Sequence, residues 1–254
     1  MFKIELDKLP LLDYYSNMFK EEISRGKSPA TRAQILTTAV ELFRVRGLEA
    51  TTMREIASAS GVALGAAYYY FASKEAIIQA YYDGVQDEHE RRVRGGLAAG
   101  KLDLKARLLL AMHTKLDILQ GDRRLLAALF RFTAEPEHPL SPLSPATRAV
   151  RGQSMAILAQ AIGDERLPDD ILNVLPMALW ALQMGILLYF IYDQSEGQQR
   201  TRRLVDGSVT LVVRVLSLAK LSALKPVRGS VFALLRDADL LPASLSTATL
   251  STRE

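Results

Sequence analysis

The chain has 254 residues, 49% apolar and 24% charged, which is the composition of an ordinary folded protein with one large or two smaller domains. It contains no cysteine, so disulfides, thiolate chemistry and cysteine-ligated metal are excluded. The net charge of +4 indicates nucleic-acid binding only weakly, because residues 30–79 carry five basic and four acidic side chains.

Residues 1–28 are predicted to form an N-terminal extension. Met1–Pro10 alternates apolar and charged residues and lacks the apolar run of a secretory signal. The rest of the extension is too apolar to be a solvated tail. We therefore expect it to dock as a helix on the body or on a partner chain, or to reach the DNA minor groove through Lys20, Arg25 and Lys27.

Helical periodicity dominates the chain and strand signals are nearly absent, so the predicted fold class is all-α. Apolar residues of 32–45 recur on one helical face, and Gly47 is expected to end that helix in a left-handed cap. Thr52 and Glu55 have the spacing of a capping box for the next helix. Ser73 is expected to cap a helix that runs to about Arg94.

Glycines and prolines divide the second half. Gly95, Gly96 and Gly100 are expected to break the chain, and Pro136, Pro139, Pro142 and Pro145 to hold residues 134–146 in an extended loop. Helices are expected near 102–119, 123–132, 144–162, 168–192 and 199–221, with Pro176 kinking or splitting the fourth, Pro226 ending the globular part, and residues 244–254 disordered.

The apolar run Val174–Tyr192 is at the short end for a membrane span and contains Pro176, Gln183 and Gly185. We therefore expect a buried helix or an oligomer interface rather than a membrane partner. Together with the absence of a signal sequence, this predicts a cytoplasmic protein.

The segment Thr51–Phe71 has the pattern of a helix-turn-helix. Ala57 is small where two short helices would cross, and Gly61 would open the tight turn between them. The second helix begins with small residues, which allow close approach to the floor of a groove. It ends in three tyrosines, whose rings and hydroxyls suit phosphates, sugars and thymine methyls. This pattern predicts a reader of the DNA major groove.

This region resembles the tetracycline-repressor (TetR) family of bacterial regulators over about Ala30–Tyr82. The resemblance implies a three-helix DNA-binding domain at 29–89 with its motif at 52–71, a helical effector-binding and dimerisation domain at 90–225, and a C-terminal tail at 226–254. The residues that carry it are Thr31-Arg32, Ile35-Leu36, Ala39, Leu42-Phe43, Gly47, Thr51-Thr52, Glu55-Ile56-Ala57, Gly61-Val62, Gly65, Tyr68, Phe71 and Ser73-Lys74-Glu75.

The resemblance also assigns the DNA contacts. Thr52 and Arg54 would contact base edges or phosphate, Thr31 or Arg32 would anchor the backbone, and Lys74 would hold a phosphate. The remaining groove-facing candidates are Leu64, Gly65, Ala66, Tyr68, Tyr69 and Tyr70. Ala63, Leu64 and Tyr70 depart from the family pattern, so direct base reading is expected to be sparse and DNA shape to matter. Alternatively, Tyr68 and Tyr69 pack inside the protein, and Arg54 is merely solvated.

The larger domain carries two further predictions. An apolar or aromatic effector would be held by large or adaptable side chains, unless these are ordinary core: Met112, His113, Leu116, Phe130, Met155, Trp180, Gln183, Met184 and Tyr189. A homodimer would form through the apolar stripes of the last two long helices, unless both stripes fill the monomer core. The predicted contacts come from Gly185, Leu188, Tyr192, Val205, Val209, Val212 and Leu216.

The sequence therefore favours a transcription regulator, and by family habit a repressor that a small, mainly apolar effector releases from a double-stranded operator. An enzyme is disfavoured, because the three histidines are far apart, no metal spacing or glycine-rich phosphate loop occurs, and no catalytic residue or cofactor is indicated. The other alternative is a helical interaction module that keeps the motif only as a scaffold.

Overall fold

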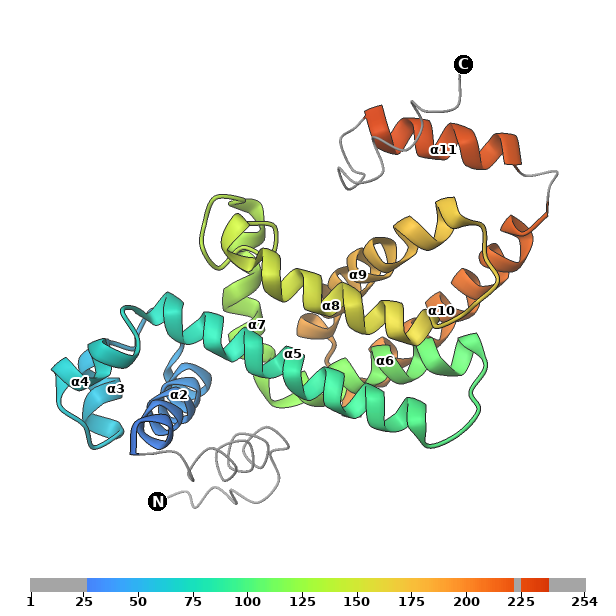
Figure 1. Ribbon diagram of the computed structural model, residues 1–254. Coiled ribbons are helices and arrows are strands. Elements are labelled where there is room, and N and C mark those ends of the chain that lie inside the picture. Colours follow the sequence, from blue (N-terminus) through green and yellow to red (C-terminus); the bar gives the residue numbers. More distant parts are fainter. Residues whose placement is uncertain (1–26, 222–224, 238–254) are drawn as a thin grey trace.

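The computed structural model describes residues 27–221 and 225–237, and every regular element in these ranges is an α- or 3₁₀-helix, which confirms the all-α prediction. Figure 1 shows α2–α4 grouped at one end and α5 crossing from them to the other helices. The α-helices are α2 (Lys27–Arg46), α3 (Met53–Ala59), α4 (Leu64–Tyr70), α5 (Lys74–Ala98), α6 (Leu104–Leu119), α7 (Arg123–Phe130), α8 (Arg148–Ile162), α9 (Asp169–Tyr192), α10 (Gln199–Ala219) and α11 (Lys225–Asp237).

The small N-terminal group has its own core. Ile35, Leu36 and Phe43 of α2 are buried, and they pack with buried residues of α3, α4 and the first turns of α5. Helix α2 ends where predicted, because Gly47 takes a left-handed backbone with φ +92°. This core fixes the angle at which α3 and α4 are presented.

Helix α5 belongs to both parts of the molecule. It extends to Ala98, so the predicted break is wrong for Gly95 and Gly96, whereas Gly100 lies between α5 and α6 as expected. A Cβ added at Gly96 would lie 2.7 Å from Cδ2 of Leu110 on α6. Gly96 therefore lies against the Leu110 side chain inside the helix, and it does not end the helix.

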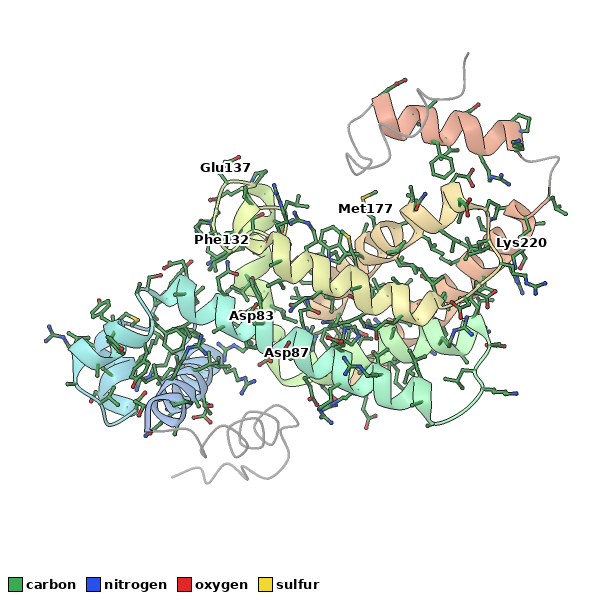
Figure 2. The ribbon with its side chains drawn as sticks, viewed as in Figure 1. Asp83, Asp87, Phe132, Glu137, Met177 and Lys220 are labelled. Carbon is green, nitrogen blue, oxygen red and sulfur yellow. The ribbon has the colours of Figure 1, made fainter. Side chains whose placement is uncertain are left out.

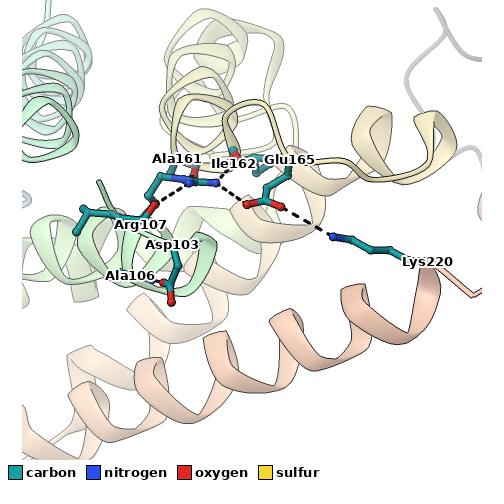
Figure 3. Close-up of polar contacts among 8 residues, drawn as sticks. Asp103, Ala106, Arg107, Ala161, Ile162, Glu165 and Lys220 are labelled. Carbon is teal, nitrogen blue, oxygen red and sulfur yellow. Dashed lines mark hydrogen bonds and ion pairs between the residues drawn. The ribbon is translucent and has the colours of Figure 1, made fainter. Parts of the chain in front are cut away.

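The second group packs α6 and α8 against α5, with α9 and α10 behind them. Arg107 of α6 joins two of these helices at the end far from α2–α4 (Figure 3). Its guanidinium donates to the carbonyl oxygens of Ala161 and Ile162, both at 2.8 Å, and to Glu165 Oε1 at 2.9 Å. These bonds satisfy carbonyls that the end of α8 leaves without helical partners.

The proline-rich loop between α7 and α8 is not extended. Amide groups of His138, Ser141 and Ser144 each donate to the carbonyl three residues earlier, at 2.9, 2.9 and 3.1 Å. These are successive β-turns with proline at the second position, which its fixed φ favours. The loop, marked by Phe132 and Glu137 in Figure 2, lies over α5.

Helix α9 is continuous through Pro176, so this proline does not split it. By length and composition alone α9 could cross a membrane, but a core helix passes the same test. Its buried residues, which include Leu179, Ile186 and Phe190, belong to the hydrophobic core of the chain. The expected reading of this run as a buried helix thus agrees with its packing.

Pro226 lies in a further helix, α11, most of whose described side chains are exposed. It is the second residue of α11, where the missing amide costs no helical hydrogen bond. Arg228 of α11 donates to Asp170 Oδ2 at 3.3 Å and to the carbonyl of Ala219. The predictions for the extension up to residue 26 and for residues 244–254 lie outside the described residues.

Candidate nucleic-acid interface and ligand cavity

The helix-turn-helix is built by short local signals. The Thr52 amide donates to Glu55 Oε2 at 2.8 Å, and the Glu55 amide donates to Thr52 Oγ1 at 3.2 Å, which confirms the predicted capping box. Gly61 has φ +67°, and the Val62 amide donates to the Ala57 carbonyl at 3.0 Å. Ala57 is buried at the crossing of the two helices. The predicted turn is confirmed.

Helix α4 presents a small and aromatic face to solvent. Gly65, Tyr68 and Tyr69 are exposed, with Tyr69 82% exposed. Leu64 and Tyr70 are half-buried against the core, and Ala66 is also half-buried. The alternative that Tyr69 packs inside the chain is therefore wrong, and the tyrosine pair is free to meet a ligand surface.

Two arginines border this face. Arg54 is exposed beside Thr52 at the start of α3, and no ion pair within the described residues holds its guanidinium. Arg32 is exposed at the start of α2 and lies over the Phe71 ring, 4.8 Å from its centroid. Arg32 is thus held in place, whereas Arg54 is available for a phosphate or a base edge.

Lys74 is placed differently from the expectation. Its Nζ donates to the carbonyl oxygen of Leu48 at 2.7 Å, and the residue is half-buried. This bond ties the start of α5 to the loop between α2 and α3. In this conformation the Lys74 ammonium stabilises the domain internally. It is not directed to a phosphate, as the resemblance implied.

We expect Lys74→Met to lower the free energy of unfolding by about 1–2 kcal/mol, because the Leu48 carbonyl loses a charged donor. Urea denaturation of the whole protein measures this. Lys105→Met, at an exposed lysine of α6, is the control and should change stability little. Unchanged stability together with DNA binding weakened equally on all sequences would return Lys74 to a phosphate contact.

A buried carboxylate connects the two parts of the molecule. Asp122, between α6 and α7, is fully buried and accepts hydrogen bonds from Arg44 Nε of α2 and, at 2.8 Å, from the Tyr81 hydroxyl of α5. An exposed ion pair between Glu49 and Arg131 spans the same boundary. The position of α2 is therefore coupled to that of α5 and α7.

A cavity of about 110 Å³ lies between α5, α6, α7, α8 and α9. Four of the predicted effector residues line it: Phe130, Trp180, Gln183 and Met184. Polar side chains on its wall that the sequence reasoning missed are Gln86, Lys115, Thr133, Arg151 and Ser154.

The other five predicted effector residues do not line this cavity. Met112 and Leu116 are buried in the core, where their spacing on α6 makes them ordinary packing residues. His113 Nε2 lies 2.8 Å from Asp206 Oδ1 of α10. Met155 is half-buried on α8, and Tyr189 is exposed on α9. Large apolar side chains in a sequence do not by themselves distinguish a cavity wall from a filled core.

The predicted dimer contacts divide into two groups. Val205, Val209 and Leu216 are buried within the chain, on the side of α10 that packs against other helices, so they cannot meet a partner here. Val212 is half-buried. Gly185, Leu188 and Tyr192 of α9 are exposed as an interface would require. On α10 the exposed apolar stripe is instead Leu204, Leu211, Val215 and Leu218.

A capped helix-turn-helix joined through one long helix to a helical domain with a cavity defines a DNA-binding transcription regulator of the ligand-responsive type. Residues 35–81 match the family model described as bacterial regulatory proteins, tetR family. Residues 107–228 match the tetracyclin repressor-like C-terminal domain. The chain belongs to the TetR family, whose members are transcription regulators and not enzymes.

Individual relatives are consistent with this family assignment. The transcriptional repressor KstR2 of Rhodococcus jostii is 33% identical over 156 residues, which are 58% of this chain and 72% of KstR2. The regulator TtgR of Pseudomonas putida is 30% identical over 105 residues, 40% of this chain and 50% of TtgR. A TetR regulator structure from Nitrosomonas europaea superposes with TM-score 0.58 at 21% identity, covering 71% of this chain and 96% of that one, which supports the fold.

Proposed function

We propose that this regulator is a cytoplasmic repressor that binds a double-stranded operator as a homodimer and leaves it when a small, mainly apolar effector enters the cavity. The observation that carries this proposal is the position of Tyr81. It lines the cavity, and its hydroxyl also donates to the carboxylate that receives Arg44 of α2. One side chain thus touches both the ligand space and the attachment of the DNA-binding domain.

Release follows from differential binding to two states. A ligand that needs more room than the empty cavity offers would displace α5 or the Tyr81 ring, and with it the Asp122–Arg44 contact. The spacing of two DNA-binding domains would then no longer match two half-sites, which lie about 34–36 Å apart or multiples of this. The effector lowers DNA affinity by as much as it prefers the displaced state. KstR2, which is named a repressor, supports this direction of control.

The homodimer is supported by the outer faces of α9 and α10. Leu188 and Tyr192 on α9 and Leu204, Leu211 and Val215 on α10 are exposed on neighbouring helices. Exposed apolar side chains gathered in this way are typical of protein interfaces. The same face on two copies would pack as a four-helix arrangement with twofold symmetry.

The test is a selection of bound DNA from a random pool with the purified protein, followed by titration of the selected operator with candidate effectors. A regulator should select a twofold-symmetric sequence, and its affinity should fall steeply with salt concentration. An interaction module that keeps the motif as a scaffold would select no sequence. That result would overturn the proposed function.

Arg54→Ala is expected to relax the preference at one base pair by roughly 1–3 kcal/mol, about 5- to 150-fold, because an arginine without an ion-pair partner at the start of α3 is suited to a base edge. Binding to the operator and to single-base variants of it measures this. Arg32→Ala is the matched comparison and should weaken all sequences about equally, as a phosphate anchor does. An unchanged base preference for Arg54→Ala would remove Arg54 from base reading.

A further inference from the structure

Lys115 places a primary amine in the wall of the cavity. It lies on α6, is 2% exposed, and its Nζ donates to Gln86 Oε1 at 2.8 Å. Within the described ranges no carboxylate forms an ion pair with it. The buried carboxylate of Glu88 on α5 pairs with Arg91 and Arg92 instead. Burying an ammonium with only a neutral acceptor is costly, so its position requires an explanation.

Two other polar groups of the wall, Thr133 and Gln183, have hydrogen-bonding capacity left. The Thr133 hydroxyl is buried and has no hydrogen-bond partner in the described part of the chain. Gln183 makes only long contacts, from Nε2 to Met112 Sδ at 3.6 Å and between Oε1 and Ser154 Oγ at 3.5 Å. Lys115, Thr133 and Gln183 can therefore all donate to a bound ligand, which suits an anionic ligand group.

The rest of the wall is apolar. It includes Leu119, Leu126, Leu129, Phe130, Trp180 and Met184. An engineered apolar cavity of about 150 Å³ holds benzene, and this cavity of about 110 Å³ is of similar order. Because the empty cavity is somewhat smaller than one that holds benzene, a ligand of one ring or a short chain with a carboxylate needs the walls to move, which is the displacement that operator release requires.

We propose that the cavity binds a monocarboxylate with an apolar body of one ring or a short chain, and that Lys115 is the counter-ion of the carboxylate. This inference rests on the proposed function and adds the chemical class of the effector to it. Burial lowers the pKa of Lys115 to about 7 in the empty cavity. A bound carboxylate favours the protonated form and supplies the partner that the ammonium lacks.

The probes are benzoate, phenylacetate, 3-phenylpropionate and hexanoate, each compared with its own primary amide by calorimetric titration of the full chain. The acid and its amide have nearly the same shape, so the comparison isolates the charge. We expect at least one acid to bind at least about tenfold more tightly than its amide, as a charge-assisted contact implies. If none of the acids binds, or if acids and amides bind equally, the proposal is overturned.

Lys115→Met is the matched variant. Methionine is close in length and needs no counter-charge, so the variant should fold as well as the parent protein. It should reduce the preference for the acid over its amide to less than about threefold, whereas Lys105→Met should leave the preference intact. Lys115→Gln, which keeps a donor for Gln86, checks that a loss of preference does not come from misfolding. A preference that survives in both Lys115 variants contradicts the assignment.

Operator release is measured separately on the same samples. An acid that binds through Lys115 but leaves the operator occupied would support the anion site while overturning the proposed effector-driven release. An effector that releases the operator but shows no preference for the acid over its amide would support the effector-driven release while overturning the anion site.

Discussion

Asp122→Ala is expected to lower the free energy of unfolding by about 3–5 kcal/mol, because removing one partner of a buried ion pair leaves the other charge uncompensated. The carboxylate is fully buried, and Arg44 retains only 14% side-chain exposure. The Tyr81 hydroxyl loses its acceptor in the same variant. Three elements, α2, α5 and the turn before α7, therefore lose a shared contact.

Urea denaturation of the variant and of the parent protein measures this loss. Glu49→Ala is the matched control, because its ion pair with Arg131 spans the same boundary but both side chains are more than half exposed. Exposed ion pairs contribute little to stability. If both variants lost stability equally, the boundary would be held by something other than the buried carboxylate.

The DNA-binding half was predictable because its signals are local. Thr52 and Glu55 are three residues apart, and Gly61 determines a turn by its own backbone preference. Lys74 escaped this reasoning because its partner is the Leu48 carbonyl, 26 residues away. A side-chain bond to a distant backbone atom leaves no periodic trace in the sequence.

The effector half was harder to predict because contacts between distant helices determine it. Gly96 was predicted to break the helix, but α5 continues through it and the Leu110 side chain of α6 packs against it. Helix α10 is apolar on two sides, and its periodicity could not indicate which side faces inward; Val205 does, and Leu211 does not.

One residue of the cavity wall could have been identified from the sequence. Lys115 falls on the same face of α6 as the buried Leu108 and Leu119, so it occupies a position where an apolar residue is expected. A charge at such a position indicates a partner or a ligand. The wall of the cavity otherwise comes from five helices that are far apart in sequence, so the shape of the cavity could not be derived without knowing how these helices pack.

The exposed stripe of α10 makes the proposed dimer testable. Leu211 is 62% exposed, and Leu204, Val215 and Leu218 lie on the same side of the helix. In a twofold interface each copy meets the same patch of the other, so one substitution acts twice. An arginine at such a position would lose its water in the interface and face the same arginine of the other copy. The two like charges repel each other, and no opposite charge is introduced to compensate them.

Leu211→Arg is therefore expected to raise the dissociation constant of the dimer at least about 100-fold, roughly 3 kcal/mol. Sedimentation equilibrium measures the constant directly, and affinity for an operator with two half-sites should fall with it. Leu143→Arg is the control, because Leu143 is similarly exposed but lies in the loop between α7 and α8. A Leu211→Arg protein that remains as dimeric as the parent would place the interface elsewhere, and the spacing of the two DNA-binding domains would have to be set by a different pair of helices.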